Sequence, residues 1–269
     1  MVSRSVIYFS LLSILGYFYE CLAMTVWAGK WENRGFLYGP AIPIYGTGAL
    51  FGTVLFEFFY RDYTPMSVFL ISMIASAILE YVVHYAMEKA FHAYWWDYSK
   101  APFNINGRIC LPASIGFGIA GLVIVYLINP LLLPKLRGLN DETAQFLALL
   151  CTSLFTADLT LTISVITAFI KRIENIDNHI NDTMDSFVGN FLDESKGINN
   201  RFYSTVDRVS ETRKRLIDRR IDRAIDSMSS ANRYILTKVK GFRGNIHAVR
   251  MNEILSRIKN RIKRRKDER

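Results

Sequence analysis

Long apolar runs separated by short polar stretches dominate the first 170 residues of the chain. A helix needs roughly 20 residues to cross the hydrocarbon core of a bilayer, and each run approaches or exceeds that length. The pattern therefore predicts an all-α fold, a multi-pass transmembrane helix bundle of about five spans. The expected spans are Ser5–Trp27, Gly39–Tyr60, Pro65–Met87, Ile109–Leu133 and Glu142–Ile170.

The pattern changes after the fifth run, where Lys171 and Arg172 are expected to end the last span. Beyond them, apolar residues recur every three or four positions among charged ones, which is typical of amphipathic helices. We predict two or three such helices that form a coiled-coil-like C-terminal tail. The chain thus divides into a transmembrane helical domain, residues 1–170, and a basic helical domain, residues 171–269.

The positive charge is concentrated in this second domain. Residues 1–170 carry nine Lys/Arg and ten Asp/Glu, net −1, whereas residues 171–269 carry 24 and 14, net +10. Basic residues near span ends favour the cytosolic side, so five spans predict an outside N-terminus and a cytoplasmic C-terminus in the cell membrane. We expect the tail to contact anionic lipid or to form homo-oligomers through its helices. Its interleaved acidic residues argue against a nucleic-acid partner.

The first apolar run contains Glu20 and lacks a small-x-small cleavage site. We therefore expect a retained first span rather than a signal peptide. The three cysteines form no CxxC pair and are expected to be buried as small apolar residues.

The segment Arg34–Gly48, termed here the Gly/Pro segment, interrupts the apolar pattern with four glycines and two prolines. These residues are unfavourable inside a helix, yet an apolar helical pattern follows directly. Irregular backbone at membrane depth is tolerated only where protein or water satisfies its amides. We therefore expect the Gly/Pro segment, with Arg34, Tyr38 and Tyr45, to belong to the functional centre.

Carboxylates lie inside the expected spans at Glu20, Glu80 and Asp158. At that depth a carboxylate is costly unless it faces the bundle interior or water. Two interpretations remain open. Either the carboxylates, with Arg34 and Arg108, form a polar cavity that binds a solute, cation or proton, or they form satisfied pairs that fix helix register.

The third expected span carries a polar stripe at four-residue intervals, which is expected to face protein. The stripe consists of Ser76, Glu80, His84 and Glu88. Small residues in the fourth span predict close contact with a neighbouring helix. They are Gly116, Gly118 and Gly121. Glu57, near the end of the second span, is expected to pair with Arg61 at the membrane interface.

Residues Ala90–Arg108, termed the aromatic loop, are too irregular for a span and too apolar for a free loop. Their aromatic side chains suit the membrane interface. The candidate site residues here are Trp96, Asp97, Asn104 and Arg108. Glu80 and His84 are spaced like metal ligands on one helix face, but no second pair has a defined spacing, so we predict no metal site and no cofactor.

The Gly/Pro segment reads RGFLYGPAIPIYGTG, and the aromatic loop leads through WDYSKAPFNINGRICLPAS. Together with Glu20, these motifs resemble the family named Putative ABC-transporter type IV, or CmpB-like, over about Leu12–Pro130. The resemblance implies a small multi-pass protein of the ABC-permease type. The chain has no Gly-x-x-x-x-Gly-Lys-Ser/Thr phosphate-binding loop, so that role implies a separate ATPase subunit as partner. The matched positions are Glu20, Arg34, Gly35, Tyr38, Gly39, Pro40, Pro43, Tyr45, Gly46, Trp96, Asp97, Tyr98, Asn104, Gly107 and Arg108.

Three functions are consistent with these features. The first is a permease-like protein that transports or gates an unidentified solute or ion through a polar intramembrane cavity. The second is a membrane-anchored scaffold or sensor that works through its basic tail. The third is an enzyme that modifies lipid head groups, with Asp97 as general base and nearby arginines holding phosphate. The enzyme is the least favoured, because no Gly-x-Ser-x-Gly nucleophile motif is present.

Overall fold

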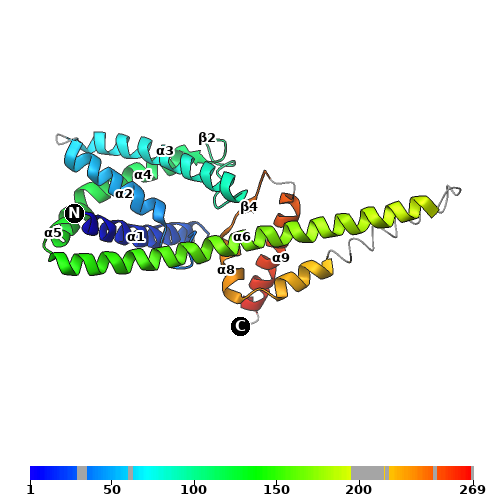
Figure 1. Cartoon of the computed structure of the whole chain (residues 1–269). Coiled ribbons are helices and arrows are strands. Elements are labelled where there is room, and N and C mark those ends of the chain that lie inside the picture. Colours follow the sequence, from blue (N-terminus) through cyan, green and yellow to red (C-terminus); the bar gives the residue numbers. More distant parts are fainter. Residues whose placement is uncertain (29–34, 60–62, 195–214, 216–217, 245–246, 268–269) are drawn as a thin grey trace. The chain divides into compact units, whose positions relative to one another are not determined.

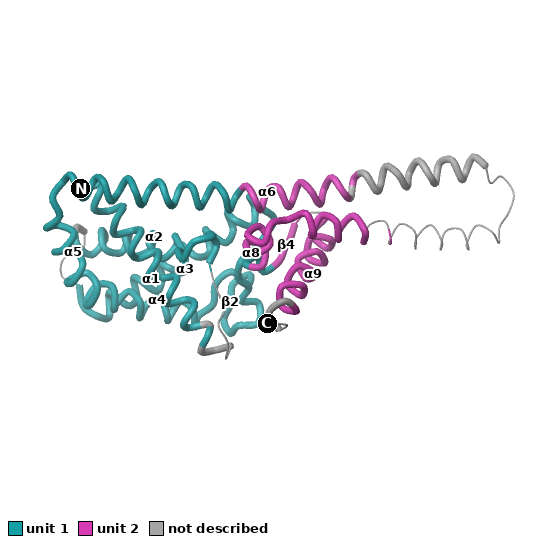
Figure 2. The backbone as a smooth tube through the Cα atoms, turned by 90° about the horizontal axis from the view of Figure 1, so that it is seen from below, with its two compact units in different colours: residues 1–163, 238–240 teal, residues 164–237, 241–269 magenta. Residues whose placement is uncertain are grey.

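The computed structural model describes residues 1–28, 35–59, 63–194, 215, 218–244 and 247–267. This part of the chain is mostly helical. It divides into two compact units, residues 1–163 with 238–240 and residues 164–237 with 241–269 (Figure 2). The predicted site residue Arg34, and the predicted partner of Glu57, Arg61, lie outside the described residues.

The first unit contains the apolar helices, of which α1 to α4 run side by side (Figure 1). Its helices are α1 (Val2–Ala28), α2 (Pro43–Val54), the π-helical turn η1 (Leu55–Phe59), α3 (Pro65–Phe91), α4 (Leu111–Val123), the π-helical turn η2 (Ile124–Ile128), α5 (Asn129–Arg137) and the start of α6 (Asp141–Glu194). Its short strands are β1 (Ala93–Tyr94), β2 (Asn104–Ile105) and β3 (Ile109–Cys110).

Four helical stretches are long and apolar enough to cross a bilayer, which makes the chain an integral membrane protein in contact with lipid. They are Val2–Ala23, Pro65–Phe91, Leu111–Arg137 and Asp141–Ile176. The second predicted span is shorter, since its helix begins at Pro43 and ends at Phe59. At 1.5 Å per residue this helix is about 25 Å long, somewhat less than the ~30 Å hydrocarbon core.

Helix α3 begins as the sequence predicts, with Pro65 in its first turn. Thr64 caps it: the Thr64 Oγ1 accepts the Ser67 amide at 3.2 Å, and the Ser67 Oγ accepts the Thr64 amide at 2.9 Å. The helix ends at His92, whose backbone is left-handed with φ of 49°. This end releases the chain into the aromatic loop.

Glycines bring α4 close to α3. A Cβ at Gly118 would lie 2.7 Å from the ring of Phe69, and a Cβ at Gly121 would lie 2.1 Å from the Ser72 Oγ. No larger residue fits at either position without a shift of α3. The predicted small-residue contact is thereby confirmed for these two glycines.

The same span widens into η2 shortly before Pro130. Proline lacks an amide proton, and its ring crowds the carbonyl four residues earlier. A π-helical turn ahead of the proline provides room for that carbonyl. The adjacent Asn129 side chain is buried inside the first unit.

An apolar core joins α1, α2, α5 and the start of α6. It contains Ile7, Tyr8, Leu12, Ala49, Leu136, Ala144 and Ala148. The rings of Phe9 and Phe155 extend this contact, with centroids 5.5 Å apart. Helix α6 is therefore part of the bundle through its first half.

Helix α6 continues unbroken for 54 residues, from Asp141 to Glu194. Lys171 and Arg172 thus end the apolar run but not the helix, because straight-chain basic residues are good helix formers. The division between the compact units falls between Ile163 and Ser164, inside α6. The sequence-based domain boundary at 170/171 stays a prediction.

The second unit has an apolar core of its own, with side chains that are at most 1% exposed. They are Ile221, Ile225, Ile235, Leu236, Met251, Ile254 and Ile258. This core is built by the helical residues 218–226, by α8 (Ser230–Lys238) and by α9 (Ala248–Asp267), and the unit also contains β4 (Gly241–Phe242). C-terminal amphipathic helices are therefore present, while their pairing as a coiled coil stays a prediction.

Basic residues of α9 make ion pairs within this unit. Arg257 lies 2.5 Å from Asp218, and Arg261 lies 2.6 Å from both Asp222 and Asp226. Part of the predicted basic cluster is thus neutralised inside the fold.

Candidate functional site

The described part of the Gly/Pro segment is anchored by two helices of the first unit. The backbone amides of Tyr38 and Gly39 each donate to a carboxylate oxygen of Asp158 on α6, both at 2.8 Å. The amide of Ile42 donates to the carbonyl of Ser13 on α1 at 3.0 Å. Protein groups therefore satisfy these amides of the irregular backbone, as its position among spans requires.

Two glycines make the close packing of this segment possible. A Cβ at Gly39 would lie 2.9 Å from the Asp158 carboxylate, and a Cβ at Gly16 would lie 2.3 Å from the ring of Tyr45. Gly16 thus lets Tyr45 rest directly on the backbone of α1. Substitution of either glycine would displace a side chain of the site.

Charged and polar groups add to this anchor. Lys238 belongs to the first unit. Its ammonium group donates a hydrogen bond to the carbonyl of Leu37. Burial lowers the pKa of Lys238 to about 8, although the Asp158 carboxylate opposes the change. Burial, and secondly the Asp158 charge, raise the pKa of Tyr38.

Four residues form what we term the acid–tyrosine cluster: Glu20, Tyr45, Glu80 and Tyr98. The Tyr45 hydroxyl donates to Oε2 of Glu20, and the Tyr98 hydroxyl donates to Oε1 of Glu80 at 3.0 Å. The charge of Glu20 also acts on Glu80 and Tyr98, so the two pairs are neighbours. Burial, followed by the nearby carboxylates, raises the pKa of Tyr98, which keeps its hydroxyl proton available for donation.

The second carboxylate oxygen of Glu80 has no such donor. Glu80 is 4% exposed, and its Oε2 is buried without a hydrogen-bond partner in the described part of the chain. Buried polar atoms in folded proteins are nearly always paired, so an exception requires an explanation. The residue that carries this unpaired oxygen also lines a cavity.

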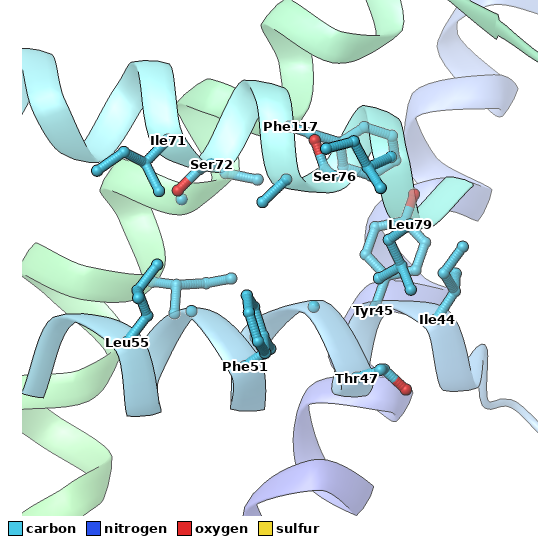
Figure 3. Close-up of a pocket in the computed structure, with 18 of the residues that line it drawn as sticks. Ile44, Tyr45, Thr47, Phe51, Leu55, Ile71, Ser72, Ser76, Leu79 and Phe117 are labelled. Atoms are coloured by element: carbon cyan, nitrogen blue, oxygen red, sulfur yellow. The ribbon is translucent and has the colours of Figure 1, made fainter. Parts of the chain in front are cut away.

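That cavity has a volume of about 370 Å³ and lies between α2 with η1 on one side and α3 with α4 and η2 on the other (Figure 3). Most of its lining side chains are apolar. The polar residues among them are Tyr45, Thr47, Ser72, Ser76 and Glu80. The structure thus differs from the expected polar cavity: Tyr45 and Glu80 bring polar groups to one end, and most of the remaining lining is apolar.

The polar stripe of α3 faces protein, as predicted, with Glu80 and His84 buried. His84 donates from Nε2 to the carbonyl of Trp96 at 3.1 Å, while its Nδ1 lies 3.6 Å from Glu88 Oε2. Among the residues that the structure describes, no three His, Cys, Asp or Glu side chains converge so as to hold a metal ion.

Arg108 is held against α3 by several partners. Its guanidinium donates to Glu88 Oε2 at 3.0 Å and to the Tyr81 hydroxyl at 2.9 Å. It also lies 5.1 Å from the ring centroids of Tyr81 and Tyr85. The indole of Trp96 donates to the Arg108 carbonyl at 2.9 Å. The structure therefore gives Arg108 and Trp96 contacts that fix the aromatic loop on α3.

Asp97 and Asn104 form hydrogen bonds within the aromatic loop itself. Asp97 Oδ1 accepts the Ser99 amide at 3.0 Å. Asn104 donates to the Ala101 carbonyl at 2.8 Å and accepts the Gly107 amide at 3.2 Å. These bonds support the antiparallel pairing of β2 with β3, in which Asn104 is opposite Cys110. This geometry holds a turn and leaves Asp97 oriented toward backbone.

The two irregular segments meet within the first unit. The rings of Phe36 and Trp95 lie edge to face with centroids 5.1 Å apart. The cluster itself joins residues of both segments with α1 and α3. The structure thus brings Glu20, Tyr45 and Glu80 together, while Tyr38 lies on the Asp158 anchor.

Asp158 was considered as a cavity carboxylate and Tyr98 as a position of the family motif, but the sequence did not predict which residues either of them meets. Tyr98 meets Glu80 across 18 positions of the chain, and Asp158 meets Tyr38 across 120. No spacing rule connects residues so far apart. The available signals were a carboxylate in the middle of an apolar helix and a tyrosine within a long motif.

A family model for Putative ABC-transporter type IV matches residues 7–163. These residues include the described Gly/Pro segment, the acid–tyrosine cluster and the cavity. A search of curated proteins and a search of solved structures found no match. The family model covers more than half of the 269 residues. The chain therefore belongs to the Putative ABC-transporter type IV family of membrane proteins.

Proposed function

We propose that this membrane protein is permease-like and moves or gates a solute or ion past the acid–tyrosine cluster. One observation carries the proposal: Glu80 lines the cavity, and its buried Oε2 has no hydrogen-bond partner among the described residues. Ionisable groups inside membrane spans mark substrate and ion pathways. A free carboxylate oxygen at a cavity is a group that a passing cation, proton or hydrogen-bond donor would meet.

The irregular backbone beside the cluster supports the same function. Transporter sites are commonly formed where a helix is interrupted near the middle of the bundle. Here α2 begins at Pro43, within the anchored Gly/Pro segment, and Tyr45 lies in its first turn. In this proposal α2 with η1 completes a fifth crossing, the C-terminus is cytoplasmic in the cell membrane, and a separate ATPase subunit supplies energy.

The test is flux through proteoliposomes that contain the purified full-length chain. The panel comprises protons, Na⁺, K⁺, amino acids and organic amines, each followed by an indicator dye or radiolabel. Glu80→Gln keeps the shape of the side chain and removes its charge, so we expect at least about a tenfold loss of flux, equivalent to one lost charged contact.

Glu57→Gln is the matched control, because Glu57 pairs with Arg137 at 3.1 Å away from the cluster and is about one-third exposed. We expect Glu57→Gln to transport like the wild type. If Glu80→Gln transports every member of the panel at the wild-type rate, the permease-like function is wrong.

The second candidate function is a membrane-anchored scaffold or sensor. The observation in its favour is the separate core of the second unit, with its Arg–Asp ion pairs. This function predicts that deletion of Ile173–Arg269 abolishes the cellular phenotype while Glu80→Gln has no effect. The enzyme is supported less, because Asp97 is used in a turn; lipid turnover by the purified protein that is lost in Asp97→Asn would favour it.

A further inference from the structure

We propose that the cavity takes an amphiphile from the bilayer, with its alkyl chain along the apolar lining and its ammonium group against Glu80. This inference rests on the proposed function, for which it names the substrate class. It is carried by three features of the same cavity: an apolar body, a rim that faces lipid, and a lining carboxylate, Glu80, one oxygen of which has no partner among the described residues.

The body of the cavity fits an alkyl chain. Its volume of about 370 Å³ lies within the range of roughly 300–1,000 Å³ that is usual for small-molecule sites. Leu55 and Ile71 lie toward one end, whereas Tyr45 lies at the other (Figure 3).

The rim of the cavity consists of exposed apolar side chains. Phe51, Ile78 and Val82 border it and are 60%, 61% and 55% exposed. Ile78 and Val82 belong to α3, which is a candidate membrane span. Such residues meet acyl chains in a bilayer, so the cavity opens toward lipid and is accessible to molecules already dissolved in the membrane.

The polar end of the cavity is acidic, and no Lys or Arg is among the described residues that line it. Glu80 lines this end, and Glu20 lies behind it as the partner of the lining residue Tyr45; the tyrosine hydroxyls donate to Oε1 of Glu80 and to Oε2 of Glu20. The nearby Arg108 is already paired with Glu88. Oε2 of Glu80 therefore remains as an acceptor, and an ammonium group supplies both three hydrogen-bond donors and the opposite charge.

The carboxylates of Glu20 and Glu80 also limit which head group the amphiphile can carry. A carboxylate head would place a third negative charge beside Glu20 and Glu80, which is unfavourable at low dielectric. A hydroxyl head would donate a hydrogen bond to Oε2 but would not neutralise the carboxylate charge. A primary amine with a long alkyl chain is therefore the simplest molecule that complements all of the cavity.

The experiment compares dodecylamine, dodecanol and dodecanoate, which share a chain and differ in their heads. Each is titrated into the full-length chain in detergent, and bound molecules are counted by native mass spectrometry. We expect dodecylamine to bind best. Glu80→Gln should weaken dodecylamine binding by roughly tenfold to a hundredfold, the range of a charge-assisted hydrogen bond, and should leave dodecanol nearly unchanged.

A second variant tests the body of the cavity independently of charge. Gly52 lines the cavity, and a Cβ added there meets no atom within 4 Å. The backbone therefore accepts a side chain at this position, and Gly52→Leu adds apolar volume to the lining while improving helix propensity. We expect it to lower the binding of dodecylamine and dodecanol alike, by at least about tenfold, while thermal unfolding shows an intact fold. Gly52→Ala should have a smaller effect.

Equal binding of the three amphiphiles to the wild type, or unchanged dodecylamine binding in either Glu80→Gln or Gly52→Leu, would overturn the inference. The proposed function fails separately. If dodecylamine binds as expected but Glu80→Gln leaves all fluxes unchanged, the site exists and the permease-like function is wrong. If flux depends on Glu80 while amines do not bind, the function stands and this substrate class is wrong.

Discussion

Two buried polar networks lie in the same helical unit, and they differ in whether their hydrogen bonds are complete. The first joins Tyr8, Thr53 and Asn129 of α1, α2 and α5. The Tyr8 hydroxyl donates to Asn129 Oδ1 at 2.8 Å and lies 2.7 Å from the Thr53 hydroxyl, and the Asn129 amide donates to Thr53 at 3.0 Å. Because Tyr8 gives its proton to Asn129, Thr53 donates to Tyr8, and the ring of three bonds is closed.

The acid–tyrosine cluster is the second network, and it is open. Its two tyrosines each donate to one carboxylate, but Oε2 of Glu80 is left over in the part of the chain described. The closed network contains no carboxylate, whereas the open one contains two. We infer that polar groups between spans stabilise the bundle when their bonds are complete and serve ligands when a charged group is left free.

The largest expected effect comes from removing the anchor of the open network. In Asp158→Asn an NH2 group replaces one of the two carboxylate oxygens. One of the two backbone amides, that of Tyr38 or that of Gly39, then loses its acceptor. We expect a loss of about 1.5–3 kcal/mol in unfolding free energy, the contribution of a hydrogen bond to a charged group, together with reduced flux. Unfolding in mixed micelles with increasing dodecyl sulfate measures the stability.

Asp141→Asn is the control for this variant. Asp141 lies on α6, as Asp158 does, but it is exposed and pairs with Arg4 of α1. Its stability should change by less than about 1 kcal/mol. Equal stability of Asp158→Asn and the wild type would show that the segment does not depend on this carboxylate.

Breaking the closed network should affect stability alone. Tyr8→Phe leaves Asn129 Oδ1 without its donor and Thr53 without its acceptor. We expect a loss of about 1–2 kcal/mol, as for other polar contacts between membrane helices, and unchanged flux per folded molecule. Tyr126→Phe, at a half-exposed ring of η2, should change neither quantity. A flux defect in Tyr8→Phe would remove the distinction between the two networks.

The smallest effect is expected in the aromatic loop that carries Tyr98. Gly107 has φ of 68°, and a Cβ there would lie 2.9 Å from Asp97 Oδ1. Gly107→Ala should cost about 1 kcal/mol through backbone strain, measured by thermal unfolding. Gly52→Ala, in a helix with open space, should instead be neutral or stabilising. Equal behaviour of the two variants would show that the turn is not required.

Features that depend on the spacing of neighbouring residues were predicted well from the sequence. Apolar run length located four candidate spans, and four-residue spacing identified the buried stripe with Glu80 and His84. Proline position also located the start of α3. These features follow from neighbouring residues on one helix, so that one sequence is sufficient to find them.

Partners across helices could not be predicted in the same way. Glu57 pairs with Arg137, 80 positions away, and no local pattern predicted this contact. The expected partner of Glu57, Arg61, lies outside the described residues, so that pairing stays a prediction. Asn129 lies inside the fourth expected span and was not singled out, because nothing next to it along the chain indicates that it meets Tyr8 and Thr53. The apolar lining of the cavity was also not predicted, because it is formed by side chains of several helices whose packing one sequence does not specify.

The most direct test of the account is the unfolding free energy of Glu80→Gln beside that of Tyr8→Phe. If Oε2 of Glu80 is free for a ligand, Glu80→Gln should be as stable as the wild type or more stable, because a buried charge is removed while the bond from Tyr98 is kept. Tyr8→Phe should be less stable in the same assay. A loss of about 1 kcal/mol or more in Glu80→Gln, comparable to a lost intramolecular hydrogen bond, would show that this oxygen is part of the structural network and would contradict the assignment.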